Sequence, residues 1–346
     1  MKRALVISGG GSKGAFAIGV VKRLLITYPT LRFDMFVGTS TGSLIVPLLA
    51  SNEIDLLETI YTTQTTQNIV LENRLGDRLN SNSIFDSTPL WALLTKYYTD
   101  SKYEKLLQIS KDIYLTTVCL QTGEIVVFTT NKTPAKPTTY SIQTLSNADQ
   151  FRKAIMASAS QPIFMPPIKV NKYVPGELHP NYQYVDGGVR EYAGVQMAID
   201  HGATEIFTIL LAPDTKNFDE REYTNLFGLL QKTIDIFTDD VSKNDLIIPN
   251  LYNQSLEYIQ AVKTKIISSG INAATVNDFF NVGKPENPFI NKLPIKLFTI
   301  RPKEILGGGP GGLTFDPNEM KGMVRKGEAS AENFIASIKS SDNTWS

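Results

Sequence analysis

The 346-residue sequence predicts an α/β protein with a mainly parallel central sheet, and two observations carry that prediction. A short apolar strand, a glycine-rich turn and a helix follow one another twice within the first 50 residues. A third apolar run, at 205–213, is continuous, as is typical of a parallel strand buried on both faces. Because successive strand-turn-helix units place their strands in parallel and cross over through helices, we expect helices to cover the sheet.

The first two units account for residues 3–50. In each of them an apolar strand leads through a glycine turn into a segment whose apolar residues recur at helical spacing. In order, the expected elements are a strand at 3–8, a turn at 9–14, a helix at 15–27, a strand at 33–37, a turn at 38–42 and a helix at 43–50. The next segment, 51–110, is more polar and is expected to be mainly helical, with a loop over 71–89.

The rest of the chain alternates strands and helices around proline-rich turns. A hairpin is predicted from strands 113–120 and 124–130, which flank Gln121-Thr122-Gly123. Further along, the expected elements are a helix at 147–158, a strand at 182–186, a helix at 194–201, the strand at 205–213, amphipathic helix over 220–280, a strand at 295–301 and a helix from about 317. No internal repeat and no obvious linker divides the chain.

Composition excludes several classes of protein. Lys and Arg number 34 and Asp and Glu also number 34, so the chain has no formal net charge and lacks the basic footprint of a nucleic-acid-binding protein. With 42% hydrophobic and 20% charged residues, it can bury a full core and is unlike a disordered chain. The single cysteine, Cys119, excludes an intrachain disulfide, and two histidines, His179 and His201, cannot build a His-rich metal site.

Apolar runs in the sequence are short. The run Ala4-Leu5-Val6-Ile7 falls below the roughly 7–15 apolar residues of a secretory signal, and no stretch of about 18 apolar residues is present to span a bilayer. We therefore expect a cytoplasmic protein. Transient docking at a membrane surface, as a peripheral protein, stays open because a sequence does not assign apolar residues to the surface.

Gly38-Thr39-Ser40-Thr41-Gly42 follows a predicted strand and opens a predicted helix, which is the setting of a G-x-S-x-G nucleophile elbow. The sharp turn would expose the Ser40 hydroxyl at a helix amino terminus, where the helix dipole favours developing negative charge. Gly38 and Gly42 would prevent side chains from colliding with the adjoining strand and helix. The structural alternative is a Gly/Ser turn with a capping hydroxyl.

Gly9-Gly10-Gly11-Ser12-Lys13-Gly14 admits two functional interpretations. As G-x-G-x-x-G between a strand and a helix, with Asp34 twenty residues after Gly14, it fits a loose dinucleotide fingerprint. As a turn of bare backbone N–H groups, it could form an oxyanion hole for acyl transfer. The oxyanion hole is favoured, because Asp34 stands near the beginning of its strand and the end of that strand delivers Ser40.

Asp186-Gly187-Gly188 stands at the end of a predicted strand, where open α/β sheets place functional groups. A serine needs a base, and the two histidines are poor candidates, since one lies in a loop and the other at a predicted helix end. A carboxylate in direct contact with Ser40 could replace them if burial raised its pKa. The structural alternative for Asp186 and Gly187 is a tight turn.

Taken together, the three motifs resemble the patatin-like phospholipase family. ASASQPIFMPPI, at 157–168, is similar to the family's segment between nucleophile and aspartate. The resemblance implies a three-layer α/β/α patatin-like fold in a single domain over 1–346, with 51–110 and 214–295 as variable, mainly helical insertions. One departure stands out: 190–194 reads Arg-Glu-Tyr-Ala-Gly where the family commonly carries an Asn-x-Pro turn.

The resemblance also implies a site and a reaction. Ser40 would be the nucleophile and Asp186 the base of a dyad, and the N–H groups of Gly10, Gly11 and Ser12 would form the oxyanion hole, with no metal and no cofactor. The implied substrate is a phospholipid or another acyl ester. An acyltransferase that uses the same acyl-enzyme, or a non-catalytic lipid-binding protein, remains an alternative, and the sequence leaves the oligomeric state open.

Overall fold

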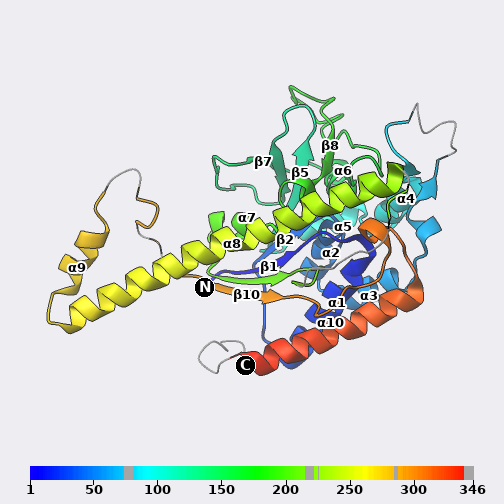
Figure 1. Cartoon of the computed structure of the whole chain (residues 1–346). Coiled ribbons are helices and arrows are strands. Elements are labelled where there is room, and N and C mark those ends of the chain that lie inside the picture. The colour runs from blue at the N-terminus through cyan, green and yellow to red at the C-terminus, as the bar shows by residue number, and fades with distance from the viewer. Residues whose placement is uncertain are drawn as a thin grey trace.

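The computed structural model describes residues 1–73, 81–214, 222–224, 226–283, 287–290, 292 and 294–338. Within these ranges, eight strands form one sheet in the order β10-β9-β1-β2-β5-β6-β7, with β8 paired to β5 (Figure 1). The strands are β1 (Arg3–Ile7), β2 (Met35–Thr39), β5 (Asp112–Cys119), β6 (Ile125–Thr129), β7 (Ser141–Thr144), β8 (Tyr184–Asp186), β9 (Glu205–Ile209) and β10 (Lys296–Ile300).

Most neighbours in this sheet are parallel, as the sequence predicts. β10, β9, β1, β2 and β5 all run in one direction, whereas β6 and β8 are antiparallel to β5. The predicted hairpin is β5 with β6, paired from Tyr114↔Thr129 to Val118↔Ile125. The class of a mixed α/β fold with a mainly parallel central sheet is therefore confirmed.

Helices cover both faces of the sheet, and the alternation of side chains along β1 assigns each residue to one face. Leu5 and Ile7 pack into the larger core, whereas Ala4 and Val6 pack into the smaller core on the opposite face. The larger core is covered by α1 (Gly14–Thr27), α2 (Thr41–Ala50), α3 (Ile54–Thr63), α4 (Thr88–Tyr97), α5 (Asp100–Gln108), α6 (Ala148–Ala159) and α10 (Pro317–Ser337). The smaller core is covered by α7 (Val195–Asp200) and part of α8 (Leu226–Ser268).

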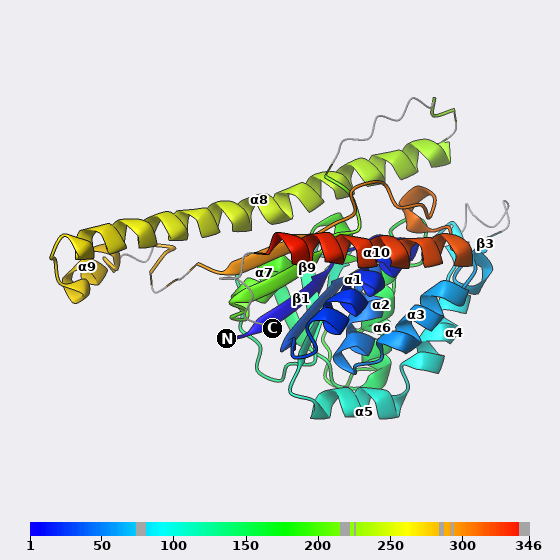
Figure 2. The same ribbon diagram turned by 90° about the horizontal axis from the view of Figure 1, so that it is seen from below.

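The predicted helical segments 51–110 and 214–295 differ in how they lie on this body. The first contains α3, α4 and α5, and its expected loop carries a short ribbon of β3 (Leu71–Glu72) and β4 (Phe85–Asp86), with 74–80 outside the described residues. The second is mostly α8, which projects past the sheet with α9 (Ala273–Phe280) at its far end (Figures 1 and 2). Among the described helices, none is both long and apolar enough to cross a bilayer.

Candidate active site

Two strand ends meet along one edge of β5. The last residue of β2, Thr39, pairs with Thr116, and the last residue of β8, Asp186, pairs with the next residue of β5, Thr117. Because β2 is parallel to β5 and β8 is antiparallel to it, the two strands run toward each other and stop at adjacent positions. Ser40, which follows Thr39, is thereby brought to Asp186 from 146 positions away in the sequence.

Ser40 occupies the strained backbone that a nucleophile elbow requires. Its φ of 56° and ψ of −123° are costly for a residue with a Cβ, by about 1–3 kcal/mol, and the cost is offset by the packing around the turn. A Cβ on Gly42 would lie 2.1 Å from the carbonyl oxygen of Ile7, and one on Gly38 would lie 2.6 Å from the backbone of Gly42. The two glycines therefore permit the close crossing of β1, β2 and α2 that holds Ser40 in place.

The carboxyl end of α6 binds both strand ends. The backbone N–H of Ser40 donates to Ser158 Oγ at 3.0 Å, and the backbone N–H of Asp186 donates to the carbonyl oxygen of Ser160 at 2.9 Å. Ser158 and Ser160 are fully buried. Sequence reasoning assigned them no role, although both belong to the segment ASASQPIFMPPI. One turn of backbone thus sets the position of the two candidate catalytic residues.

The environment of Asp186 raises the pKa of its carboxyl group toward neutral pH. Burial raises its pKa from an ordinary 3.8 to about 6, against the opposing effects of hydrogen bonds from the Ser40 side chain and the Gly188 N–H. The Gly188 N–H donates to Asp186 Oδ1 at 2.8 Å and fixes the carboxyl orientation. A carboxylate with this pKa can accept a proton from Ser40 and release it again.

The glycine loop 9–14 lies beside Ser40 and leads from β1 into α1. Among the described residues, no acceptor is bound by the N–H groups of Gly10 and Gly11, both of which line the cavity described below. Gly11 contacts Gly312 so closely that a Cβ on Gly11 would lie 2.2 Å from the Gly312 carbonyl oxygen. A second glycine-rich segment, 307–312, therefore packs directly against this loop and also lines the cavity.

The other residues of the three motifs are placed as follows. Gly9 and Lys13 line the cavity, whereas Ser12 is fully buried and its side chain lies toward Gly308. The glycines Gly14, Gly187 and Gly188 pack against Thr41, Thr116 and Asp186, respectively. The structure thus brings Ser40, Asp186 and the loop glycines together, while Ser12 contributes no side chain to the cavity.

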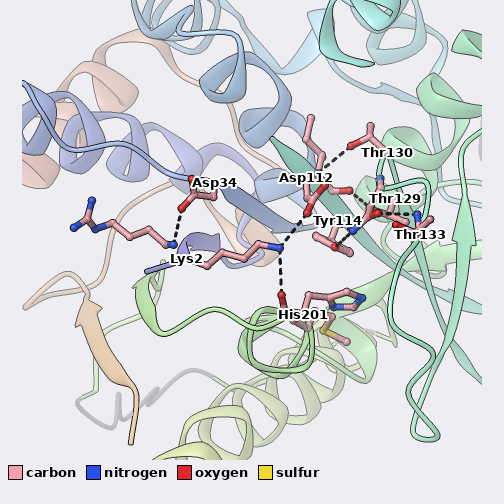
Figure 3. A network of polar contacts seen from close by, with 12 residues as sticks. Lys2, Asp34, Asp112, Tyr114, Thr129, Thr130, Thr133 and His201 are labelled. Carbon is pink, nitrogen blue, oxygen red and sulfur yellow. Dashed lines mark hydrogen bonds and ion pairs between the residues drawn. The ribbon is translucent and has the colours of Figure 1, made fainter. Parts of the chain in front are cut away.

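Asp34 lies at the opposite end of the parallel strands from Ser40, directly before β2 begins. Its carboxylate accepts a hydrogen bond from the backbone N–H of Arg3 at 2.8 Å, at the start of β1 (Figure 3). The five residues of β2 span about 16 Å and separate Asp34 from Ser40. Asp34 is therefore remote from the glycine loop, and the dinucleotide interpretation loses the acidic residue on which it depended.

Both histidines lie outside the cavity. Lys2 Nζ donates to the carbonyl oxygen of His201 and to Asp112 Oδ2, both at 3.2 Å, and the backbone N–H of Asp112 donates to the carbonyl oxygen of Asp34, so His201 and Asp34 belong to one polar network (Figure 3). The ring of His201 lies 4.4 Å from that of Tyr114. His179 stacks on Tyr182 with the ring centroids 4.4 Å apart. The only nearby group suited to act as a base for Ser40 in the described part of the site is Asp186.

A cavity of about 1170 Å³ opens at Ser40 and Asp186. Much of its apolar wall comes from α2, α3, α4 and the segment between α3 and β3, and this part includes Leu44, Leu48, Leu57, Ile60, Ile69, Leu90, Leu93 and Leu94. Charged side chains also reach the lining, among them Lys13, Lys232 and Lys243 as well as Asp214 and Glu222. The cavity therefore presents apolar surface for a hydrocarbon chain and charged groups for a polar head.

In the described ranges, no three His, Cys, Asp or Glu side chains are grouped in a way that could hold a metal ion.

Ser40 and Asp186 thus lie together at the wall of a large cavity in a mixed α/β fold. Residues 5–199 match the model of the patatin-like phospholipase family, and the chain belongs to that family. It is 41% identical over 64 residues to the cUMP-AMP-activated phospholipase of Escherichia coli, a match that covers 17% of this chain and 20% of that protein. The crystal structure of VipD from Legionella pneumophila is similar over 97% of this chain and 67% of that one, with 12% identity and a TM-score of 0.40.

Proposed function

We propose that this chain hydrolyses acyl esters of phospholipids or lysophospholipids through a Ser40–Asp186 dyad and an acyl-enzyme. The observation that carries the proposal is the junction on β5, which brings a strained serine to a buried carboxyl group with a raised pKa at the wall of an apolar cavity. Membership of the patatin-like phospholipase family supports a lipid ester as substrate, and the relative from E. coli is itself named a phospholipase.

The reaction proceeds in two halves. Asp186 takes the proton from Ser40 Oγ as the oxygen attacks the ester carbonyl, and the N–H groups of Gly10 and Gly11 stabilise the oxyanion, with Ser12 N–H as the third expected donor. Asp186 then gives its proton to the leaving alkoxide oxygen, which departs as the alcohol and leaves the acyl-enzyme. In the second half, Asp186 removes a proton from water, the hydroxide attacks the acyl carbon, and the fatty acid is released as Ser40 recovers its proton.

A test of this proposal combines active-site labelling with product analysis. A fluorophosphonate should modify the protein on Ser40, located by peptide mass spectrometry, and should abolish fatty acid release from phospholipid vesicles in proportion to labelling. A competing alcohol acceptor in the same assay separates hydrolysis from acyl transfer. Labelling at a different serine, or vesicle hydrolysis that survives complete labelling, contradicts the proposal.

The pKa of Asp186 sets the expected pH dependence. Asp186 has to be deprotonated to act as a base, so kcat/KM should fall about tenfold per pH unit below about pH 6 and stay level above it. The pKa of Asp245 is also raised to about 6, by burial, and an Asp245→Asn variant serves as the control. If the inflection disappears in Asp245→Asn, it reports the titration of Asp245 and not of Asp186, which contradicts this prediction.

A further inference from the structure

Tyr192 binds the glycine loop directly, from the segment in which the sequence departs from its family. Its hydroxyl donates to the carbonyl oxygen of Gly9 at 2.7 Å, and the side chain is buried. Its ring also lies against two glycines, since a Cβ on Gly9 would come within 3.3 Å of it and one on Gly188 within 3.6 Å. Tyr192 thus spans the loop beside Ser40 and the turn that follows Asp186.

The geometry of the peptide unit makes this contact important for Gly10. The carbonyl of Gly9 and the N–H of Gly10 belong to the same peptide, which is planar and trans, so the two bonds point in opposite directions. A hydroxyl that fixes the carbonyl on one side therefore fixes the N–H on the other side. The hydrogen bond also polarises the peptide and strengthens Gly10 N–H as a donor.

We propose that Tyr192 is a positioning residue that orients the Gly10 N–H for the oxyanion. This inference rests on the proposed acyl hydrolase activity. Because an oxyanion hole depends on donors that are already aligned before charge develops, a loosely held Gly9–Gly10 peptide would stabilise the transition state less while binding the substrate equally well.

The position of Tyr192 depends in turn on α8. The backbone N–H groups of Tyr192 and Ala193 donate to Asp245 Oδ2 at 2.6 and 2.9 Å. Asp245 lies beyond the segment that matches the family, on the helix that projects from the body (Figure 1). A continuous set of contacts therefore runs from α8 through Asp245 and Tyr192 to the Gly9–Gly10 peptide.

The test compares two tyrosine hydroxyls that both donate to backbone carbonyls. Removing a complete oxyanion donor costs about 10²–10³ in kcat, and a misaligned donor loses part of that, so Tyr192→Phe should lower kcat by roughly tenfold or more and leave KM within about twofold. The control is Tyr103→Phe, because the buried Tyr103 hydroxyl donates to the Leu145 carbonyl at 3.1 Å, away from the cavity. The rate of fluorophosphonate labelling should fall together with kcat, and the pH inflection near 6 should stay in place.

Three results would overturn the inference: a kcat for Tyr192→Phe equal to that of Tyr103→Phe, a change in KM alone, or a shifted pH inflection. If Tyr192→Phe does not fold, Asp245 provides the second comparison. Asp245→Ala should lower kcat in the same way, and Asp245→Asn, whose amide oxygen can still accept both N–H bonds, should lower it less; equal effects contradict the link to α8. A wild-type protein without turnover or Ser40 labelling would instead refute the proposed function itself.

Discussion

Ser40→Ala and Asp186→Asn should each lower kcat for ester hydrolysis by about 10⁴-fold, and the double variant should lose little more. The reason is that in the proposed dyad the two side chains act on the same proton, so a serine without its base and a base without its serine are nearly equally inactive. Single-turnover rates on a chromogenic medium-chain ester measure all three variants. The exposed serine of α5 supplies the control, and Ser101→Ala should keep the wild-type rate.

The stability of Asp186→Asn should move in the opposite direction from its activity. The folded-state pKa of about 6 lies above the ordinary 3.8, so burial of the charged form destabilises the wild type, fully above pH 6 and not at all below about pH 4. At pH 8 the penalty removed is on the order of 3 kcal/mol. Urea unfolding at pH 8 should show a more stable variant, with the difference shrinking toward pH 4. A less stable variant at pH 8 would contradict this account of the raised pKa.

Gly312→Ala should lower kcat by about 10²-fold, because a displacement of about 1 Å at a catalytic group has an effect of this size. A Cβ on Gly312 would lie 2.2 Å from the Gly10 carbonyl oxygen and 3.2 Å from the Gly11 Cα, so the loop has to move. The backbone of Gly312 has a φ of +73°, which adds strain for alanine.

Gly176→Ala separates these two effects. Gly176 has a φ of +77°, and a Cβ there would meet no atom within 4 Å, so the control carries the strain without the collision. Measured kcat, KM and melting temperature should show a loss of stability in both variants, larger in Gly312→Ala because of the added collision, and a loss of kcat in Gly312→Ala alone. Equal kcat values would mean that the segment 307–312 does not determine the position of the glycine loop.

Local sequence patterns were sufficient to predict the elements that contain Ser40 and the glycine loop. Strand, turn and helix follow one another there within a few residues, and the structure has them at β1, β2, α1 and α2. Asp186 could be placed at a strand end for the same reason. The α/β class followed from these units, since hydrophobic periodicity reports burial directly.

Contacts between distant segments could not be predicted in this way. The antiparallel pairing of β8 with β5 is what brings Asp186 to Ser40, and a strand of three residues carries no signal for its partner. The same holds for Ser158, Gly312 and Tyr192, whose partners are 118, 302 and 183 positions away. In the case of Tyr192, the departure from the family's Asn-x-Pro turn was the one visible sign that this position differs.

The position of Ser40 and Asp186 and the shape of the cavity come from different parts of the chain. The former depends on β2, β5, β8 and the end of α6, whereas the apolar wall comes largely from α2, α3 and α4. α2 belongs to both sets, because it begins at the elbow and continues into the wall, and the end of α6 also reaches the lining through Ala159. If the chain is the proposed acyl hydrolase, substitutions on α3 and α4 change which acyl chain fits without altering Ser40 and Asp186, so the preferred chain length can evolve separately from the rate of the chemical step.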